Sequence, residues 1–204
     1  MSMMNALRRA LSRFLPYHKM RGGQTKMDAD YAHGKWDYLR GIEELGRFSI
    51  LVGYCQYLKP RGRILEIGCG EGILQGRLDP DRYSRFVGVD ISAKAIQRTR
   101  PDEKTTFVRA DAVDWQPVEV FDLIIFNECL EYFDDPLALV RHYESSLAPD
   151  GAFLVSMFQG VETARTARIW KWLESVYAVE DITRVTNRAG WTWILKVLRP
   201  CDSA

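Results

Sequence analysis

The stretch Ile64-Leu65-Glu66-Ile67-Gly68-Cys69-Gly70-Glu71-Gly72 decides the fold. Its first half is an apolar, β-favouring run that is interrupted by one acid, which is typical of a buried parallel strand. Its second half holds glycine at every second position, and such glycines let the backbone approach a ligand closely. The segment therefore predicts a strand that ends in a ligand-binding turn. The structural alternative is a glycine turn at a sheet edge.

The glycine spacing distinguishes two classes of nucleotide-like cofactor. The dinucleotide fingerprint G-x-G-x-x-G places its third glycine three positions after the second. Here that position is Ile73, and the third glycine comes one residue earlier, at Gly72. Glu71, beside the turn, would also repel the pyrophosphate of a nicotinamide dinucleotide. The spacing therefore disfavours a nicotinamide-dependent reductase.

Three further apolar runs follow in order, and each ends in a polar residue. The first ends at Asp90, the second at Asp111 and the third at Asn127. At the position of Asp90 in a doubly wound sheet, a carboxylate can accept hydrogen bonds from both ribose hydroxyls of an adenosine. Either aspartate alone could instead be a helix N-cap or a turn residue. The ordered series is more specific than any one of its members.

The E-x-G-x-G-x-G segment and the acids that follow it resemble the class I S-adenosylmethionine (SAM) dependent methyltransferases. The resemblance covers residues 41–200. It implies an α/β, Rossmann-like sheet of seven strands in the order 3-2-1-4-5-7-6, with helices on both faces and a terminal β-hairpin. It also implies SAM as cofactor, and in-line transfer of its methyl group to an oxygen or nitrogen of an acceptor.

The resemblance also implies which residues hold the cofactor. Glu66 and the turn glycines would hold the methionine half, with Glu66 reaching the amino group. Asp90 would bind the ribose, and Asp111 with the backbone of Ala112 would bind the adenine. We expect a β-carbon at Gly68 or Gly70 to collide with the cofactor. The implied cofactor-binding residues are Glu66, Gly68, Cys69, Gly70, Gly72, Asp90, Ile91, Asp111, Ala112 and Asn127.

The segment from Glu128 to Pro136 resembles the E-x-L-E-H-x-x-D-P run of small-molecule and cell-envelope-associated methyltransferases. Tyr132 stands where that run often has histidine, which puts a histidine base there in doubt and leaves a packing tyrosine as the alternative. The Asn-Pro-Pro-aromatic motif of adenine and glutamine N-methyltransferases is absent, so those substrates are disfavoured. The expected acceptor is a small molecule or saccharide.

In this family the segment before the first strand usually covers the active site, which places Tyr31, His33 and Trp36 near the acceptor. Histidine has an unperturbed pKa near 6.5 and suits proton removal from an acceptor. The alternative for His33 is a loop-packing or solvated side chain. His142 is expected at the surface. The candidate catalytic residues are His33, Glu128, Tyr132 and Tyr31.

The hydrophobic pattern alternates between strands and helices, which predicts βαβ units and a parallel sheet. Pro149-Asp150-Gly151 is interpreted as a turn that starts the fifth strand, and Asn187-Arg188-Ala189-Gly190 as the turn of the terminal hairpin. The expected strands are 63–68, 85–90, 105–110, 121–127, 151–158, 179–187 and 191–198. The expected helices are 71–78, 92–100, 136–147 and 161–176, and an earlier one follows helical spacing from Ile42 to Cys55 and ends near Pro60-Arg61-Gly62.

The chain divides into an arm and lid segment, residues 1–40, and a methyltransferase domain, residues 41–204. The charges from Met1 to Met27 are all positive, and Leu7 to Leu15 carry an apolar helical stripe. The arm is interpreted as an accessory helix. A transit peptide and a helix in peripheral contact with a membrane are the alternatives. A loop is expected at 21–24. We expect the segment before residue 40 to serve the acceptor and not the cofactor.

The composition limits the other function classes. A net charge of +1 over 204 residues argues against a nucleic-acid binder, since such domains usually carry a strong basic excess. The four cysteines lack C-x-x-C pairing, so they indicate neither a metal site nor a disulfide framework. Cys69 in the turn favours a reducing compartment, and we expect the cytoplasm. The alternative to an enzyme is a SAM-binding regulatory or partner subunit with little turnover, but the intact motifs favour the enzyme.

Overall fold

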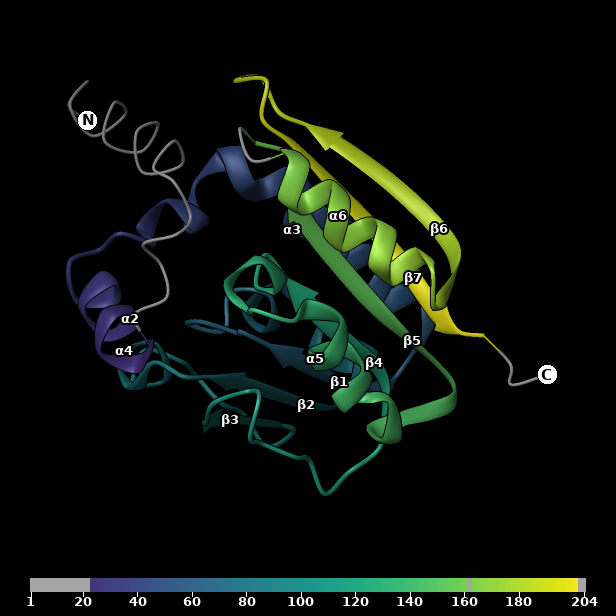
Figure 1. Ribbon diagram of the computed structural model, residues 1–204. Helices are drawn as coiled ribbons and strands as arrows, with labels where there is room; N and C mark the ends of the chain where they lie inside the picture. Colours follow the sequence, from purple (N-terminus) through teal and green to yellow (C-terminus); the bar gives the residue numbers. More distant parts are fainter. Residues whose placement is uncertain (1–22, 161–162, 202–204) are drawn as a thin grey trace.

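The computed structural model describes residues 23–160 and 163–201. Among them, seven strands form one sheet in the order β3-β2-β1-β4-β5-β7-β6, as predicted (Figure 1). The first five strands pair in parallel, and β7 pairs antiparallel with both β5 and β6. The strands are β1 Gly62–Ile67, β2 Tyr83–Asp90, β3 Thr105–Arg109, β4 Phe121–Asn127, β5 Leu147–Phe158, β6 Tyr177–Thr186 and β7 Thr192–Pro200.

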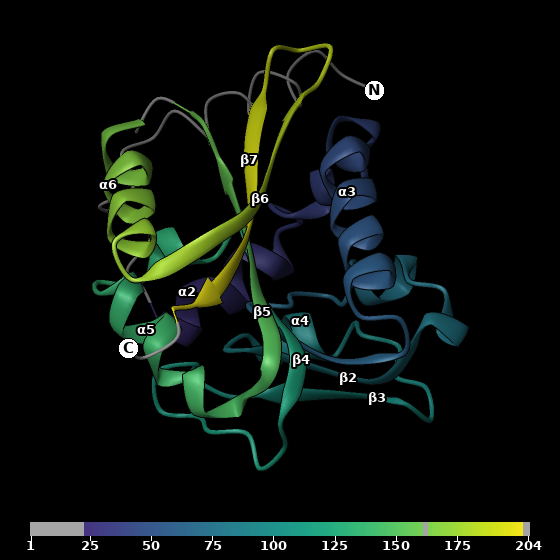
Figure 2. The ribbon, with the colours of Figure 1, turned by 90° about the vertical axis from the view of Figure 1, so that its right-hand side faces the viewer.

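Helices cover both faces of the sheet. Figure 2 shows α3 on one side and α5 with α6 on the other. The α-helices are α2 Gly23–Ala32, α3 Ile42–Leu58, α4 Ala93–Ile96, α5 Pro136–His142 and α6 Thr163–Glu174. Short 3₁₀ helices are η2 Asp37–Arg40, η3 Gln75–Arg77, η4 Pro80–Arg82, η5 Leu130–Tyr132 and η6 Glu144–Ser146. No helix among the described residues is long and apolar enough to span a membrane.

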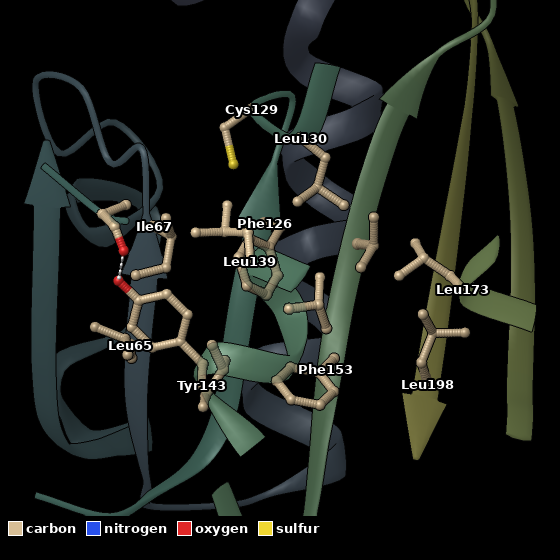
Figure 3. Packing of buried hydrophobic residues seen from close by; sticks show 14 of the residues in the cluster. Leu65, Ile67, Phe126, Cys129, Leu130, Leu139, Tyr143, Phe153, Leu173 and Leu198 are labelled. Atoms are coloured by element: carbon tan, nitrogen blue, oxygen red, sulfur yellow. Dashed lines mark hydrogen bonds between the residues drawn. The ribbon is translucent and has the colours of Figure 1, made fainter. Parts of the chain in front are cut away.

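The central strands of the sheet are buried on both faces, whereas the edge strand β6 is mostly exposed. Side chains alternate along each strand, so neighbouring residues pack against opposite layers of helices. Ile64 packs in a cluster with α3, whereas Leu65 packs in the cluster that contains α5 and α6. Figure 3 shows the second cluster, where the Tyr143 hydroxyl donates a hydrogen bond of 2.8 Å to the carbonyl of Ala112. The alternation that turns Ile64 toward α3 places Glu66 on the same face, at the carboxyl end of β1.

The segment after the glycine turn differs from the predicted helix 71–78. The chain runs through turns to Leu74 and forms only the single 3₁₀ turn η3. Gly70 and Gly72 have φ values of 55° and 71°, outside helical geometry, and glycine disfavours a helix further at Gly76. The predicted helix 92–100 is also shorter and ends at Ile96.

Two more boundaries differ from the sequence prediction. β5 begins at Leu147, so the segment Pro149-Asp150-Gly151 lies inside the strand, where the register against β4 shifts. Proline has no N–H for the ladder, which accounts for an irregularity there. The helix expected to reach residue 147 ends at His142 and is followed by η6.

The loop predicted before α2 and the predicted turn of the terminal hairpin have different outcomes. The loop expected at 21–24 is helical from Gly23 onward, where α2 begins. The hairpin turn is confirmed, since the Asn187 N–H donates to the Trp191 carbonyl at 2.9 Å. The apolar stripe from Leu7 to Leu15 and residues 161–162 of the expected helix lie outside the described residues.

Candidate active site

A cavity of about 870 Å³ lies at the carboxyl ends of β1, β2 and β4. Its volume is within the range of small-molecule sites, and parallel sheets bind ligands where the strand order reverses, here between β1 and β4. The lining includes the turn from Gly68 to Glu71, the acids at the strand ends, and side chains from α2, η2, α3 and η5. One cavity therefore joins the segments that the sequence singled out.

The glycines of the turn are required by the packing of the protein itself. Gly68, Gly70 and Gly72 all have positive φ, a conformation that L side chains rarely adopt. A β-carbon at Gly70 would lie 2.6 Å from the Tyr31 hydroxyl, and one at Gly68 would lie 2.8 Å from the Cys129 β-carbon. The expected collision is thus already with protein atoms. Gly70 is the better probe because its neighbour is the end of a side chain.

The Asp90 side chain stabilises this turn by accepting backbone hydrogen bonds. It is 6% exposed, and its two oxygens accept hydrogen bonds from the backbone N–H groups of Gly70, at 2.9 Å, and Ser92, at 2.8 Å. Burial raises the pKa of Asp90, and the two backbone hydrogen bonds oppose that rise. Each carboxylate oxygen has a second lone pair, so Asp90 retains acceptor capacity for a ligand in the cavity.

Most of the other residues predicted to bind the cofactor lie along the same wall, but Gly72 is not part of the cavity lining. Cys69, Ile91, Asp111 and Ala112 all line the cavity. Asp111 is exposed, and its side chain accepts a hydrogen bond of 3.0 Å from the Val113 N–H. It is therefore held less firmly than Asp90.

His142, expected at the surface, is half-buried and also lines the cavity, which the sequence did not predict. Its Nε2 atom lies 3.0 Å from the carbonyl oxygen of Trp115, and its ring packs edge-on against Tyr143. These contacts hold the imidazole in the cavity wall.

Four polar side chains, three of them buried, are linked by hydrogen bonds from α3 to the ends of β1 and β4, and we call them the buried polar chain. Arg47, 1% exposed, forms an ion pair of 3.0 Å with Glu44. Its Nη1 also donates a hydrogen bond to Asn127 Oδ1, and Asn127 Nδ2 donates to Glu66 Oε1 at 3.2 Å. All four side chains line the cavity. Glu44 and Arg47 were not predicted from the sequence, although their i,i+3 spacing on an amphipathic helix was the available signal.

Glu66 is the last member of the buried polar chain, and one of its carboxylate oxygens has no hydrogen-bond partner among the described residues. The side chain is 1% exposed, and the oxygen without a partner is Oε2. Burial raises the pKa of Glu66 to about 8, against a hydrogen bond from Asn127 and the charge of Arg47. Buried polar atoms are normally satisfied, so an orphaned oxygen in a cavity wall points to a ligand that donates there.

The lid segment is fastened near the cofactor wall. α2 lies beside α4, as Figure 1 shows. Asp28 accepts hydrogen bonds from the Lys94 N–H at 3.0 Å and the Ser92 hydroxyl at 2.7 Å, and these bonds lower the pKa of Asp28. With Tyr31 over Gly70, the segment contacts the turn directly. This geometry differs from the expectation that it serves the acceptor alone.

Three aromatic side chains of the lid segment meet one from η5 in the cavity wall. We call Tyr31, Trp36, Tyr38 and Tyr132 the aromatic compartment, and all four line the cavity. The ring of Trp36 lies 6.1 Å from Tyr31, 6.3 Å from Tyr38 and 6.4 Å from Tyr132, between centroids. The contact with Tyr132 is edge-to-face, an arrangement that aromatic pairs favour.

The four candidate catalytic residues are only partly brought together. Tyr31, Glu128 and Tyr132 line the cavity, whereas His33 does not. His33 is exposed, and its Nδ1 atom lies 2.7 Å from the carbonyl oxygen of Ala29. A catalytic role for His33 stays a prediction that this arrangement does not support.

Glu128 is firmly positioned at the end of β4. Its oxygens accept hydrogen bonds from the Ser156 hydroxyl at 2.7 Å and the Phe158 N–H at 3.0 Å. Its φ of 56° is unusual for a residue other than glycine, and such backbone strain clusters at functional sites. Tyr31 is the poorer base, because burial raises its pKa well above the ordinary value.

Comparisons with known proteins agree with this architecture. The family model described as "Methyltransferase domain" matches residues 5–196. Trans-aconitate 2-methyltransferase of Escherichia coli is 37% identical over 101 residues, which are 46% of this chain and 38% of that protein. The human protein named "Arginine-hydroxylase NDUFAF5, mitochondrial" is 31% identical over 177 residues, 77% of this chain and 49% of that protein. The chain thus spans less than half the length of these curated relatives.

Among solved structures, the N-methyltransferase NodS from Bradyrhizobium japonicum, in complex with S-adenosylhomocysteine (SAH), superposes with a TM-score of 0.74. It is 19% identical and the match covers 88% of this chain and 98% of that one, which supports the fold. The family match extends over nearly the whole chain. The chain therefore belongs to the methyltransferase-domain family of class I SAM-dependent methyltransferases, and the predicted family, sheet order and cofactor are confirmed.

Proposed function

We propose that the protein transfers the methyl group of SAM to an oxygen or nitrogen atom of a small-molecule or saccharide acceptor, by in-line displacement. The observation that carries this proposal is the single cavity in which the glycine turn, the strand-end acids and the aromatic compartment meet. Relatives support the small-molecule class, because the name of trans-aconitate 2-methyltransferase states such a substrate.

The buried polar chain fits the amino-acid head group of SAM. We assign its carboxylate to Arg47, which Glu44 and Asn127 hold in place, and its ammonium to the open Oε2 atom of Glu66. A zwitterion supplies one charge of each sign, and hydrogen bonds between charged groups are stronger than neutral ones. Asn127 then acts mainly by positioning Glu66 and Arg47.

The adenosine half would follow the wall from Asp90 to Ala112. Asp90 would accept hydrogen bonds from the ribose hydroxyls, and Asp111 with the Ala112 backbone would bind the adenine. Cys69 and Ile91 line the space between these groups. Gly68, Gly70 and Gly72 shape the turn that approaches the cofactor.

When bound, SAM supplies an electrophilic methyl group. The protein contributes alignment and exclusion of water, and orientation alone can lower a barrier by about 7–11 kcal/mol. Tyr31 and the other rings of the aromatic compartment would cover the reacting atoms. For an acceptor that must lose a proton, we assign the exchange to Glu128 or Tyr132, which reach the cavity where His33 does not.

Transfer of an isotopic label tests this proposal. Purified protein is incubated with methyl-labelled SAM and fractionated small molecules, and label is followed in the acceptor and SAH in the cofactor pool. We expect both to appear in equal amounts. The Gly70→Leu variant is the matched control, since it blocks the turn at one position. SAH formed without a labelled acceptor would contradict the proposal.

A second candidate is a SAM-binding protein that does not transfer the methyl group, as a partner subunit or in another reaction. The observation that favours it is the relative named as an arginine hydroxylase, 31% identical over 77% of this chain. Saturable SAH binding without SAM consumption, in the presence of every acceptor fraction, would favour this candidate. Cytoplasmic location and membrane contact through the arm stay predictions.

A further inference from the structure

We propose that Arg165, on α6, is a positioning residue that holds Tyr132 in place against the rest of the aromatic compartment. This inference rests on the proposed function, in which Tyr132 belongs to the wall that meets the acceptor. It adds a residue that lies outside the cavity lining and that no sequence motif marked. It is carried by the hydrogen bonds of Arg165, by the short helix that they complete, and by the ring contact of Tyr132.

The first observation is that Arg165 binds the main chain on both sides of Tyr132. Its Nη2 atom donates a hydrogen bond of 3.0 Å to the carbonyl oxygen of Glu131 and one of 2.7 Å to the carbonyl oxygen of Phe133. α6, which carries Arg165, lies in contact with η5. Hydrogen bonds from a charged donor are stronger than those between neutral groups. One guanidinium group thus fixes the backbone before and after Tyr132.

The second observation is that η5 depends on a donor from outside. This helix has only three residues, and its own hydrogen bonds run from the Tyr132 N–H to the Cys129 carbonyl, at 3.0 Å, and from the Phe133 N–H to the Leu130 carbonyl, at 3.2 Å. Carbonyls at the C-terminal end of a helix have no partner inside it, and arginine side chains can supply one. Arg165 does so from up to 34 positions further along the chain. The conformation of η5 therefore depends on α6.

The third observation is what η5 presents to the cavity. Tyr132 lines the cavity, and its ring meets that of Trp36 edge to face, with 6.4 Å between the centroids. This kind of contact depends on the orientation of both rings. Trp36 comes from the lid segment, so a shift of η5 would change how the two sides of the compartment meet. A misplacement of about 1 Å can slow an oriented reaction about a hundredfold. Arg165 thus acts on the acceptor through Tyr132 and does not touch the acceptor itself.

Fluorine NMR tests this positioning without an acceptor. The protein is labelled with 5-fluorotryptophan and saturated with SAH, and the Trp36 signal is identified by its absence from Trp36→Phe. Arg165→Met keeps the aliphatic part of the side chain and removes the donors, so it should shift or broaden the Trp36 signal. Arg168→Met is the matched control on the same helix. Arg168 lies 5.5 Å from the Trp172 ring, and its loss should leave the Trp36 signal unchanged.

Turnover gives a second readout, with methyl-labelled SAM and the small-molecule fraction that takes up the label. Arg165→Met should slow transfer at saturating SAM about tenfold to a hundredfold, because the acceptor meets a displaced ring. The Kd for SAH should stay within about twofold of the wild-type value, since none of the residues assigned to the cofactor changes. Arg165→Lys should restore most of the rate, because an ammonium group retains charged donors. Arg168→Met should transfer the label at the wild-type rate.

A double-mutant cycle separates positioning from a general loss of stability. Two residues that act through one contact are coupled, so the second substitution adds little once the first has been made. In a Tyr132→Ala background, Arg165→Met should therefore slow transfer by less than a further twofold or so. Thermal unfolding of each variant is measured alongside. Should Arg165→Met not fold, Arg165→Gln, which keeps a neutral donor, takes its place, with effects expected in the same direction.

Three outcomes would overturn the inference. They are a Trp36 signal that Arg165→Met leaves in place, equal slowing by Arg165→Met in the wild-type and Tyr132→Ala backgrounds, and an SAH affinity that falls as far as the transfer rate. Each of them leaves the proposed function intact. Absence of label transfer by wild-type protein that binds SAH would instead contradict the proposed function, and the fluorine signal would still decide whether Arg165 positions Tyr132. The two failures are therefore distinguishable.

Discussion

The two halves of the cavity are built in different ways. The half that we assign to the cofactor, called the cofactor half, is made by one turn and the strand ends beside it, where backbone N–H groups of Gly70 and Ser92 are fixed by Asp90. The half that we assign to the acceptor, called the acceptor half, is made by side chains from segments far apart in sequence, with Trp36 meeting Tyr132. The first half is fixed by backbone geometry and the second by tertiary packing. We therefore expect them to respond separately to substitution.

The largest difference in SAH affinity is expected between the alanine variants of the two aspartates in the cofactor half. Asp90→Ala should weaken SAH binding at least a hundredfold, because two ribose hydroxyls lose a charged acceptor and such bonds are worth about 1.5–3 kcal/mol each. Asp111→Ala should weaken binding less than tenfold, since Asp111 is exposed and the Ala112 backbone remains. Calorimetric titration with SAH measures both.

Asp90 also braces the turn, so its variant needs a control for folding. Thermal unfolding of Asp90→Ala separates a lost ligand contact from a lost fold, and Asp90→Asn keeps the shape of the side chain. If Asp111→Ala proved the more damaging of the two, the assignments of ribose and adenine would have to be exchanged.

A smaller effect is expected at the buried polar chain, where Glu44 and Arg47 were not predicted from the sequence. The double variant Glu44→Gln/Arg47→Met avoids leaving a buried carboxylate without its partner. It should weaken SAH binding about tenfold to a hundredfold, because a charged hydrogen bond to the ligand carboxylate is lost. Methylthioadenosine has no amino-acid head group, so its affinity should change less than twofold.

The affinities of SAH and methylthioadenosine also show what result would contradict the assignment of Arg47 to the head group. Equal weakening of SAH and methylthioadenosine by the double variant would show that the polar chain supports the fold of the cavity. Arg47 would then not bind the head group.

The smallest and most specific predicted effect is the release of one proton from Glu66 when the ligand binds. Its pKa of about 8 in the free protein lies above its ordinary value, so the group holds its proton at pH 6.5. An ammonium placed on Oε2 favours the carboxylate, so ligand binding should release close to one proton, and affinity should rise as pH increases toward 8. Calorimetry in buffers of different ionisation enthalpy counts the protons.

Glu66→Gln is the control for this count, because it keeps the shape and cannot ionise. Its binding should release no proton and should lose the rise in affinity below pH 8. Proton release that is unchanged in Glu66→Gln would assign the titration to another group, with Asp90, a buried acid that lines the same cavity, as the first candidate.

The sequence predicted the strand ends around the glycine turn because their signals are local. The glycine turn, Asp90 and Asp111 each follow an apolar run, and parallel strands bring their ends to one edge. The predicted helix after the turn was wrong because the conformations of Gly70 and Gly72 outweigh the helical spacing of apolar residues. The local sequence pattern predicts where the strands end, but it does not predict the conformation of the segments that connect them.

Side chains whose positions depend on tertiary packing were harder to predict, in both halves of the cavity. Glu44 and Arg47 have the spacing of a surface ion pair, and only the sheet against α3 reveals that they are buried. His33 has suitable chemistry, but it follows α2, is exposed and lies outside the cavity lining, whereas His142 lines the cavity. Residue type alone did not distinguish these two histidines.

One titration tests most directly whether the two halves are independent. SAH is titrated into the wild-type chain, Trp36→Leu and Asp90→Ala, with NAD⁺ as the parallel ligand. We expect one SAH per chain in the wild type, a Kd within twofold of it in Trp36→Leu, binding weakened at least a hundredfold in Asp90→Ala, and no saturable heat with NAD⁺. Equal losses in both variants, or saturable binding of NAD⁺ at the same site, would contradict this account.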